Sequence, residues 1–113
     1  MQDYKDHYQI EITTLADIPA GTGLGSSGAF TVSALKALQI FNSQYHSNKS
    51  IAELACHIEI ERLKEPVGKQ DQYISAFGGI NSFEIDRSGK VKISPIPASA
   101  DTLDELESNL LLF

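Results

Sequence analysis

The sequence has a single cysteine, no tryptophan and only nine basic residues among its 113 positions. With one cysteine, Cys56, the chain has no internal disulfide framework, which is typical of a protein from a reducing cytoplasm. Fifteen acidic residues outnumber the nine lysines and arginines, and the net charge of −6 disfavours binding to nucleic acid or to an anionic membrane. No apolar run approaches the roughly 20 residues that a helix needs to cross a bilayer. These shortages exclude a secreted disulfide scaffold, a membrane protein and a nucleic-acid-binding protein, and they predict a cytoplasmic protein.

The residues that are present are typical of one globular domain that mixes helices and strands. Hydrophobic residues make up 42% of the chain, and its length allows one domain of ordinary size. Apolar positions alternate over residues 8–15, which predicts a half-buried strand. The remaining pattern predicts helices at 26–41, 50–63, 69–77 and 101–109 and a hairpin with strands at 80–85 and 91–96. We therefore expect an α+β fold, with helices packed on a mostly antiparallel sheet.

Two of the predicted helices have distinctive side chains. Ser50 and Glu53 have the spacing of a capping box, so the second helix should begin with Ser50 as its N-cap. Leu103, Leu106 and Leu110 recur at helical spacing, so these three leucines should face the core.

A dense stretch of glycine and serine precedes the helix that begins near Ser26. Residues 23–28 satisfy the pattern G-x-G-x-x-G, but no second buried strand with a terminal acid follows, which disfavours a dinucleotide-binding fold. A P-loop needs lysine and then serine or threonine after its last glycine, and here Ala29 and Phe30 follow Gly28. From the residues alone, two interpretations remain: a glycine turn whose serines cap the helix, or a phosphate-binding loop at a helix N-terminus.

One acidic residue, Asp71, lies among amides, an aromatic ring and glycines between residues 68 and 79. A hydroxyl that accepts a phosphoryl group needs a carboxylate nearby to orient it and take its proton, and Asp71 is a candidate for this role. Glu59 and Glu61 are candidates to complete a Mg²⁺ shell with a serine hydroxyl and phosphate oxygens. Each residue has an ordinary alternative: helix capping or a salt bridge to Lys69 for Asp71, and a solvated helix face for the glutamates.

Residues 19–29, Pro-Ala-Gly-Thr-Gly-Leu-Gly-Ser-Ser-Gly-Ala, closely resemble the phosphate loop P-x-x-x-G-L-G-S-S-A-A of the GHMP kinases. This family comprises the galactokinases, homoserine kinases, mevalonate kinases and phosphomevalonate kinases. The one departure is Gly28, where alanine is usual, and we expect this exchange of small residues to be mild. The resemblance implies an ATP-phosphate site that is formed by Pro19, Gly21, Thr22, Gly23, Leu24, Gly25, Ser26, Ser27 and Gly28.

A second segment also resembles this family. Residues 66–72, Pro-Val-Gly-Lys-Gln-Asp-Gln, are similar to the region that holds the catalytic aspartate of galactokinase-like members. The resemblance implies that Asp71 is the general base and that Ser27 and Glu59 together bind Mg²⁺, with Glu61 as the alternative metal ligand.

The resemblance extends to the acceptor. It implies substrate contacts from Gly68, Gln70, Asp71 and Tyr73. Within the family, residues 16–21 and 68–73 are most similar to D-glycero-D-manno-heptose 7-phosphate kinases. The implied reaction is ATP-dependent phosphoryl transfer to the anomeric hydroxyl of a sugar phosphate, so the expected partners are ATP and a small sugar phosphate.

GHMP kinases are much longer than this chain. The resemblance therefore implies that residues 1–113 form part of the N-terminal, ATP-binding domain and that the C-terminal domain is truncated. We expect activity in an intact parent protein and no activity from the chain alone. The alternative is a non-catalytic nucleotide- or sugar-binding module, or a degenerate kinase remnant. Because a truncated sheet exposes apolar surface and an unpaired edge, self-association of the chain is a further hypothesis.

Overall fold

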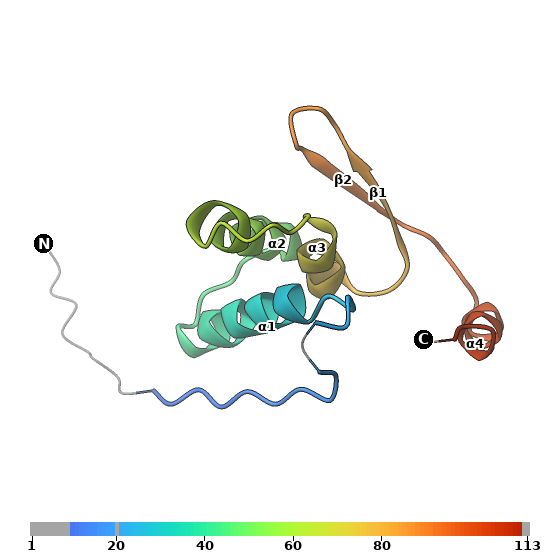
Figure 1. The fold of residues 1–113 in the computed structure, drawn as a ribbon, viewed down its shortest axis with the longest axis horizontal. Helices are drawn as coiled ribbons and strands as arrows, with labels where there is room; N and C mark the ends of the chain where they lie inside the picture. Colours follow the sequence, from blue (N-terminus) through green and yellow to red (C-terminus); the bar gives the residue numbers. More distant parts are fainter. Residues whose placement is uncertain (1–9, 20, 112–113) are drawn as a thin grey trace, which may run out of the picture.

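A computed structural model describes residues 10–19 and 21–111 of the chain. Its elements are α1 (Ser26–Phe41), α2 (Asn48–Cys56), the π-helical turn η1 (His57–Arg62), α3 (Gln70–Phe77), β1 (Asn81–Ile85), β2 (Val91–Pro95) and α4 (Ala100–Ser108). Figure 1 shows α1, α2 and α3 gathered together, while the β1–β2 hairpin and α4 extend to one side. The fold is α+β, as the sequence predicted. Within the described ranges, no helix is long and apolar enough to span a membrane.

Helix α1 begins where the glycine-rich stretch ends. Gly25 precedes the helix with a left-handed backbone (φ 72°, ψ 23°), which glycine adopts without steric cost. The N–H of Ala29 donates to the carbonyl of Gly25 at 3.0 Å and closes the first helical turn. The predicted range of 26–41 is confirmed at both ends. No side-chain hydrogen bond caps the helix, so the interpretation of the serines as mere caps is wrong.

The N-cap of helix α2 lies three residues before the predicted one. Ser47 is the N-cap, and its hydroxyl oxygen accepts a hydrogen bond from the N–H of Ser50 at 3.1 Å. The predicted capping box is therefore wrong, because Ser50 already lies inside the helix and Glu53 instead lies 3.9 Å from the ammonium of Lys49. The helical path continues through η1 to Arg62, one residue short of the predicted end.

The core lies where α1, α2 and α3 meet. The ring of Tyr73 stacks on Phe77 with 6.3 Å between centroids, and it meets Phe83 of β1 edge-on at 6.4 Å. Phe83 and the buried Val91 of β2 thereby attach the hairpin to the helices. Most of the other buried side chains are small or β-branched, which lets the helices approach closely. They are Val32, Ile51, Ala52, Ala55, Cys56 and Ala76.

Strands β1 and β2 pair in antiparallel fashion, as predicted, and Asp86 organises the turn between them. Its Oδ1 accepts hydrogen bonds from the hydroxyl and the N–H of Ser88 and from the N–H of Lys90. These bonds favour the ionised carboxylate, with the Ser88 hydroxyl contributing most, and so lower the pKa of Asp86. The ammonium of Lys69 donates to the carbonyl of Gly89 at 2.6 Å, which ties the turn to the segment before α3.

Two further predicted features differ from the structure. Residues 10–15 are exposed and form no strand, because no neighbouring strand pairs with them in the part of the chain that is described; residues 8 and 9 of this prediction lie outside it. Helix α4 forms as predicted, yet it buries no residue, and Leu103, Leu106 and Leu110 are 41%, 46% and 66% exposed. An apolar stripe predicts which face of a helix can be buried, but burial also needs another element to pack on that face. Helix α4 has no extensive contact with another described element.

Candidate active site

The glycine loop, residues 21–25, leads into the N-terminus of α1 as an open turn. Gly21, Gly23 and Gly25 have φ values between 72° and 81°, a region that other residues adopt only with strain. A Cβ at Gly21 or Gly23 would meet no atom within 4 Å, so the backbone there borders open space. The loop therefore presents its backbone beside the positive end of a 16-residue helix, an arrangement that stabilises a bound phosphate.

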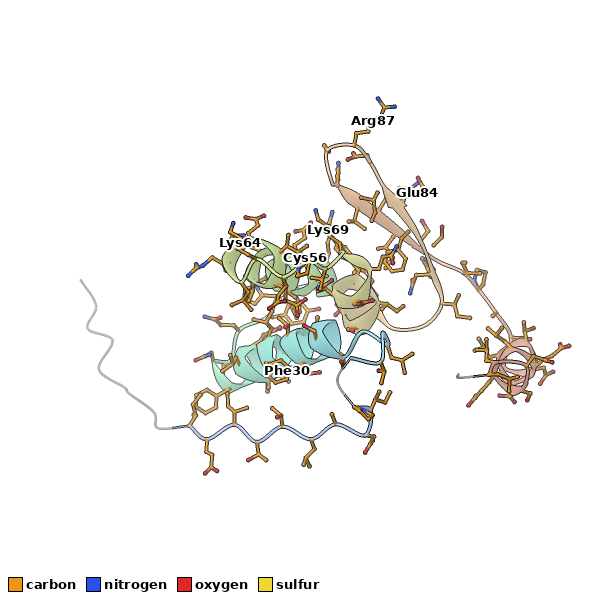
Figure 2. All side chains as sticks on the ribbon, in the orientation of Figure 1. Phe30, Cys56, Lys64, Lys69, Glu84 and Arg87 are labelled. Atoms are coloured by element: carbon orange, nitrogen blue, oxygen red, sulfur yellow. The ribbon has the colours of Figure 1, made fainter. Side chains whose placement is uncertain are left out.

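The other residues around the loop close its turn or line a groove. The hydroxyl of Thr22 donates to the carbonyl of Pro19 at 3.2 Å. Leu24 and Ser26 line a groove of about 550 Å³ between α1 and residues 12–18. Phe30, which Figure 2 labels on α1, lines the same groove. Ser26 therefore faces the groove.

Ser27 instead contacts Glu59 of η1. Its hydroxyl donates to Oε1 of Glu59 at 2.9 Å, and the hydroxyl of Thr31 donates to the same oxygen at 2.5 Å. The side-chain amide of Gln72 donates to the other oxygen, Oε2. Glu59 is only 1% exposed, and among the described residues no basic side chain forms an ion pair with it. Neutral donors from two helices thus hold a buried carboxylate whose charge a cation would compensate.

The two candidate glutamates both lie in the π-helical turn η1. Leu63 N–H donates to the carbonyl of Ile58 at 2.9 Å, the five-residue spacing that widens the helix here. Glu59 turns inward to Ser27, whereas the side chain of Glu61 is 67% exposed and lies 2.8 Å from Nδ1 of His57. The structure therefore brings Glu59, and not Glu61, together with the serine.

The separation of Ser27 Oγ and Glu59 Oε1 fits two neighbouring ligands of a magnesium ion. Mg²⁺ binds oxygen octahedrally at roughly 2.0–2.1 Å, which puts adjacent ligands about 2.9 Å apart. The two oxygens are 2.9 Å apart. No group of three or more His, Cys, Asp or Glu side chains in residues 10–19 and 21–111 could hold a metal by itself. A magnesium ion at this pair would therefore need further oxygen ligands, such as nucleotide phosphates and water.

Asp71 lies in the first turn of α3, directly against the start of α1. A Cβ at Gly28 would come 2.9 Å from Cβ of Asp71, and one at Gly25 would come 3.1 Å from its Cγ. The expectation that glycine in place of alanine at position 28 is a mild change is therefore wrong, because a methyl group there would be closer than normal contact. The ordinary roles of Asp71 are not seen, since no side chain caps α3 and Lys69 bonds to Gly89.

The predicted substrate residues do not share one surface. Gly68 and Gln70 are exposed in the segment that leads to Asp71. Tyr73 is 3% exposed, and burial raises the pKa of its hydroxyl. Its ring belongs to the core and does not line a surface site.

Sequence reasoning did not single out Thr31 and Gln72, although both contact Glu59. Thr31 follows Ser27 by four residues, so the two hydroxyls lie on one face of α1, a spacing that could have indicated a pair. Gln72 is adjacent to Asp71, and nothing in the local pattern indicates that its side chain turns inward.

The sequence profile described as "GHMP kinases N terminal domain" matches residues 1–79. The chain belongs to the GHMP kinase family. This confirms the resemblance that the glycine loop and the Asp71 segment carry.

Three GHMP kinase comparisons bear on the kind of acceptor. The chain is 33% identical to D-glycero-alpha-D-manno-heptose 7-phosphate kinase of Campylobacter jejuni over 109 aligned residues. This alignment covers 96% of the chain and 32% of that protein. It is 34% identical over 77 residues to mevalonate kinase of Methanothermobacter thermautotrophicus, covering 68% and 25% respectively. The solved structure of a D-glycero-D-manno-heptose 1-phosphate kinase from Bacteroides thetaiotaomicron matches with a TM-score of 0.78 at 40% identity, over 81% of the chain and 30% of that protein. The chain thus spans about a third or less of the length of these relatives.

Proposed function

We propose that this chain supplies the nucleotide-phosphate site and the catalytic carboxylate of an ATP-dependent sugar-phosphate kinase. One observation carries the proposal: the glycine loop, the Ser27–Glu59 pair and Asp71 converge on the N-terminal end of α1. Membership of a kinase family supports phosphoryl transfer, and the two heptose kinases among its relatives favour a heptose phosphate as the acceptor.

Each part of the convergence has a distinct role in this proposal. The backbone N–H groups of the loop and of the first turn of α1 bind the nucleotide phosphates, because they lie at the positive end of the helix dipole. Ser27 and Glu59 would hold Mg²⁺, which neutralises charge on the phosphates when it is bound. Asp71 is exposed at the same end of α1, where its carboxylate accepts the proton of the acceptor hydroxyl.

The transfer is a single displacement. The sugar hydroxyl oxygen forms a bond to the γ-phosphorus, the bond from that phosphorus to the bridging oxygen of ADP breaks, and the hydroxyl proton passes to Asp71. With a heptose 7-phosphate as acceptor, the reacting hydroxyl is the anomeric one, and the products are the bisphosphate and ADP. Because the chain spans about a third of the heptose 7-phosphate kinase, we further propose that transfer takes place in a longer protein and that the chain alone binds nucleotide without turnover.

Two measurements test the proposal. Isothermal titration calorimetry of the 113-residue chain with Mg·ATP tests the phosphate site alone. For transfer, the chain would replace the aligned segment of the Campylobacter jejuni relative, and ADP release would be measured with D-glycero-D-manno-heptose 7-phosphate. In this chimera, Asp71→Asn should lower kcat by about 10²–10⁴, as loss of a general base does. The matched control is Asp101→Asn, which removes a carboxylate from the first turn of α4.

The outcomes separate the proposal from its alternatives. Mg·ATP binding by the chain together with Asp71-dependent ADP release by the chimera supports the kinase function. Binding by the chain with no ADP release from a folded chimera favours a non-catalytic nucleotide-binding module. Neither binding nor release would contradict the proposal and favour a degenerate remnant.

A further inference from the structure

Gln72 is a buried polar residue that no step of the proposed reaction uses. Its side chain is 1% exposed, and its amide nitrogen donates to Oε2 of Glu59. Its amide oxygen is buried and has no hydrogen-bond partner among the described residues. An unpaired buried oxygen costs stability, and an apolar side chain of similar size would avoid this cost. The hydrogen bond from the amide nitrogen to Glu59 gives a reason for a glutamine at this position.

The hydrogen bonds to Glu59 come from two different helices. Ser27 and Thr31 of α1 donate to Oε1, while Gln72 of α3 donates to Oε2. Donors on both oxygens fix the plane of the carboxylate, which none of them could do alone. If Ser27 were to ligate a cation, the hydrogen bonds from Thr31 and Gln72 would still hold the Glu59 carboxylate in place.

Gln72 also adjoins the two other parts of the site. It directly follows Asp71, and its backbone nitrogen lies 3.0 Å from the point that a Cβ on Gly28 would occupy. Any shift of α3 that moves Gln72 away from Glu59 therefore also moves Asp71 along the start of α1.

We propose that Gln72 is a positioning residue that orients the Glu59 carboxylate toward its metal and couples the position of this ligand to that of Asp71. The inference rests on the proposed function, in which Glu59 is a magnesium ligand. Gln72 acts through Glu59 and touches neither the nucleotide nor the acceptor.

The test compares ATP binding to the chain in the presence of Mg²⁺ and in the presence of EDTA. Gln72→Leu keeps the size of the side chain and removes the donor. We expect Mg·ATP to bind about 10–100-fold more weakly, as is usual when the partner of a metal ligand is lost, while ATP in EDTA binds as before. The matched control is Gln39→Leu, the same exchange at a glutamine of α1 whose amide oxygen is also buried and unpaired. This control should leave both affinities unchanged.

A thermal unfolding scan and a double mutant separate positioning from a merely structural role. If Gln72→Leu weakens ATP binding equally with Mg²⁺ and with EDTA, or if it leaves Mg·ATP binding unchanged, the inference is overturned. If the leucine variant unfolds at a lower temperature, the unbranched Gln72→Met replaces it in the same comparison. In a Glu59→Gln background, Gln72→Leu should have no further effect on the Mg²⁺ dependence; an additive loss would contradict action through Glu59.

The wild-type titration distinguishes this inference from the proposed function. Wild-type chain that binds ATP no better with Mg²⁺ than with EDTA would overturn the magnesium role of Glu59 in the proposed function, and this inference with it. Wild-type chain that shows the Mg²⁺ dependence while Gln72→Leu retains it would overturn the role of Gln72 alone.

Discussion

Replacing Gly28 with alanine would place a methyl group between α1 and the turn that carries Asp71. The new Cβ would lie 2.9 Å from Cβ of Asp71, 3.0 Å from its carbonyl carbon and 3.0 Å from the backbone nitrogen of Gln72. Ordinary contacts of this kind are 3.4–4 Å, so α3 would have to move by about 0.5 Å. Two of the three atoms belong to the backbone, so a side-chain rotation does not relieve the contact.

The expected change in stability is the difference between two opposing effects. Overpacking of a buried site costs typically about 1–3 kcal/mol, while alanine in place of glycine inside a helix stabilises by about 1 kcal/mol. Gly28→Ala should therefore destabilise the fold by roughly 0–2 kcal/mol. The effect on transfer should be clearer, because misplacing a catalytic group by about 1 Å can cost roughly a hundredfold in rate. For a shift of about half that size we expect roughly a tenfold loss of kcat.

Urea unfolding of the chain and ADP release by the chimera would measure these two effects. Ser33→Ala is the control, because it adds a good helix former at an exposed position of the same helix without a clash. A Gly28→Ala variant that is more stable than wild type by the full helix-propensity gain, and that retains wild-type kcat, would refute the reasoning. It would mean that α3 does not rest on Gly28 in solution.

Four further predictions follow from the site and its surroundings. Ser27→Ala should weaken Mg·ATP binding and lower turnover together; an unchanged Mg²⁺ dependence in a titration would exclude it as a ligand. Glu59→Gln should likewise weaken Mg·ATP binding and lower turnover, whereas Glu61→Gln should leave both unchanged. If only Glu61→Gln has these effects, Glu61 is the metal ligand. Burial raises the pKa of the Cys56 thiol from 9.0 to about 11, so this thiol stabilises the fold fully below pH 9 and loses that contribution as pH rises toward 11. Chemical unfolding across that range should show a smaller decline for Cys56→Ala than for wild type, and parallel curves would contradict it. Because Leu15 and Phe30 at the groove are 96% and 55% exposed, we expect the chain to self-associate at micromolar concentration, and a monomer mass by light scattering would contradict this.

Elements whose ends are marked by neighbouring residues in the sequence were predicted most accurately. Helix α1 was predicted at both ends because glycines bound it on one side and a polar segment on the other. The start of α2 was missed because Ser47 and Ser50 are both suitable caps, and only the extended backbone of Ser47 decides between them. The predictions of a strand at residues 8–15, of which the structure describes 10–15, and of inward leucines in and after α4 were wrong for another reason. Alternating apolar residues in a strand, or apolar residues at helical spacing, indicate which face of the element is apolar. That face is buried only where another element packs on it.

The glycine loop and the family could be predicted from the amino-acid sequence, because both depend on residue types at fixed positions. Gly21, Gly23 and Gly25 adopt positive φ values, which glycine allows without strain because it has no Cβ. The contacts of Glu59 with Ser27 and with Gln72 are seen only in the folded protein. These contacts join residues that are 32 and 13 positions apart, and they depend on how α1, η1 and α3 pack, which no local pattern encodes. Packing likewise made Gly28 a critical residue, since the atoms that a methyl group would meet belong to another helix.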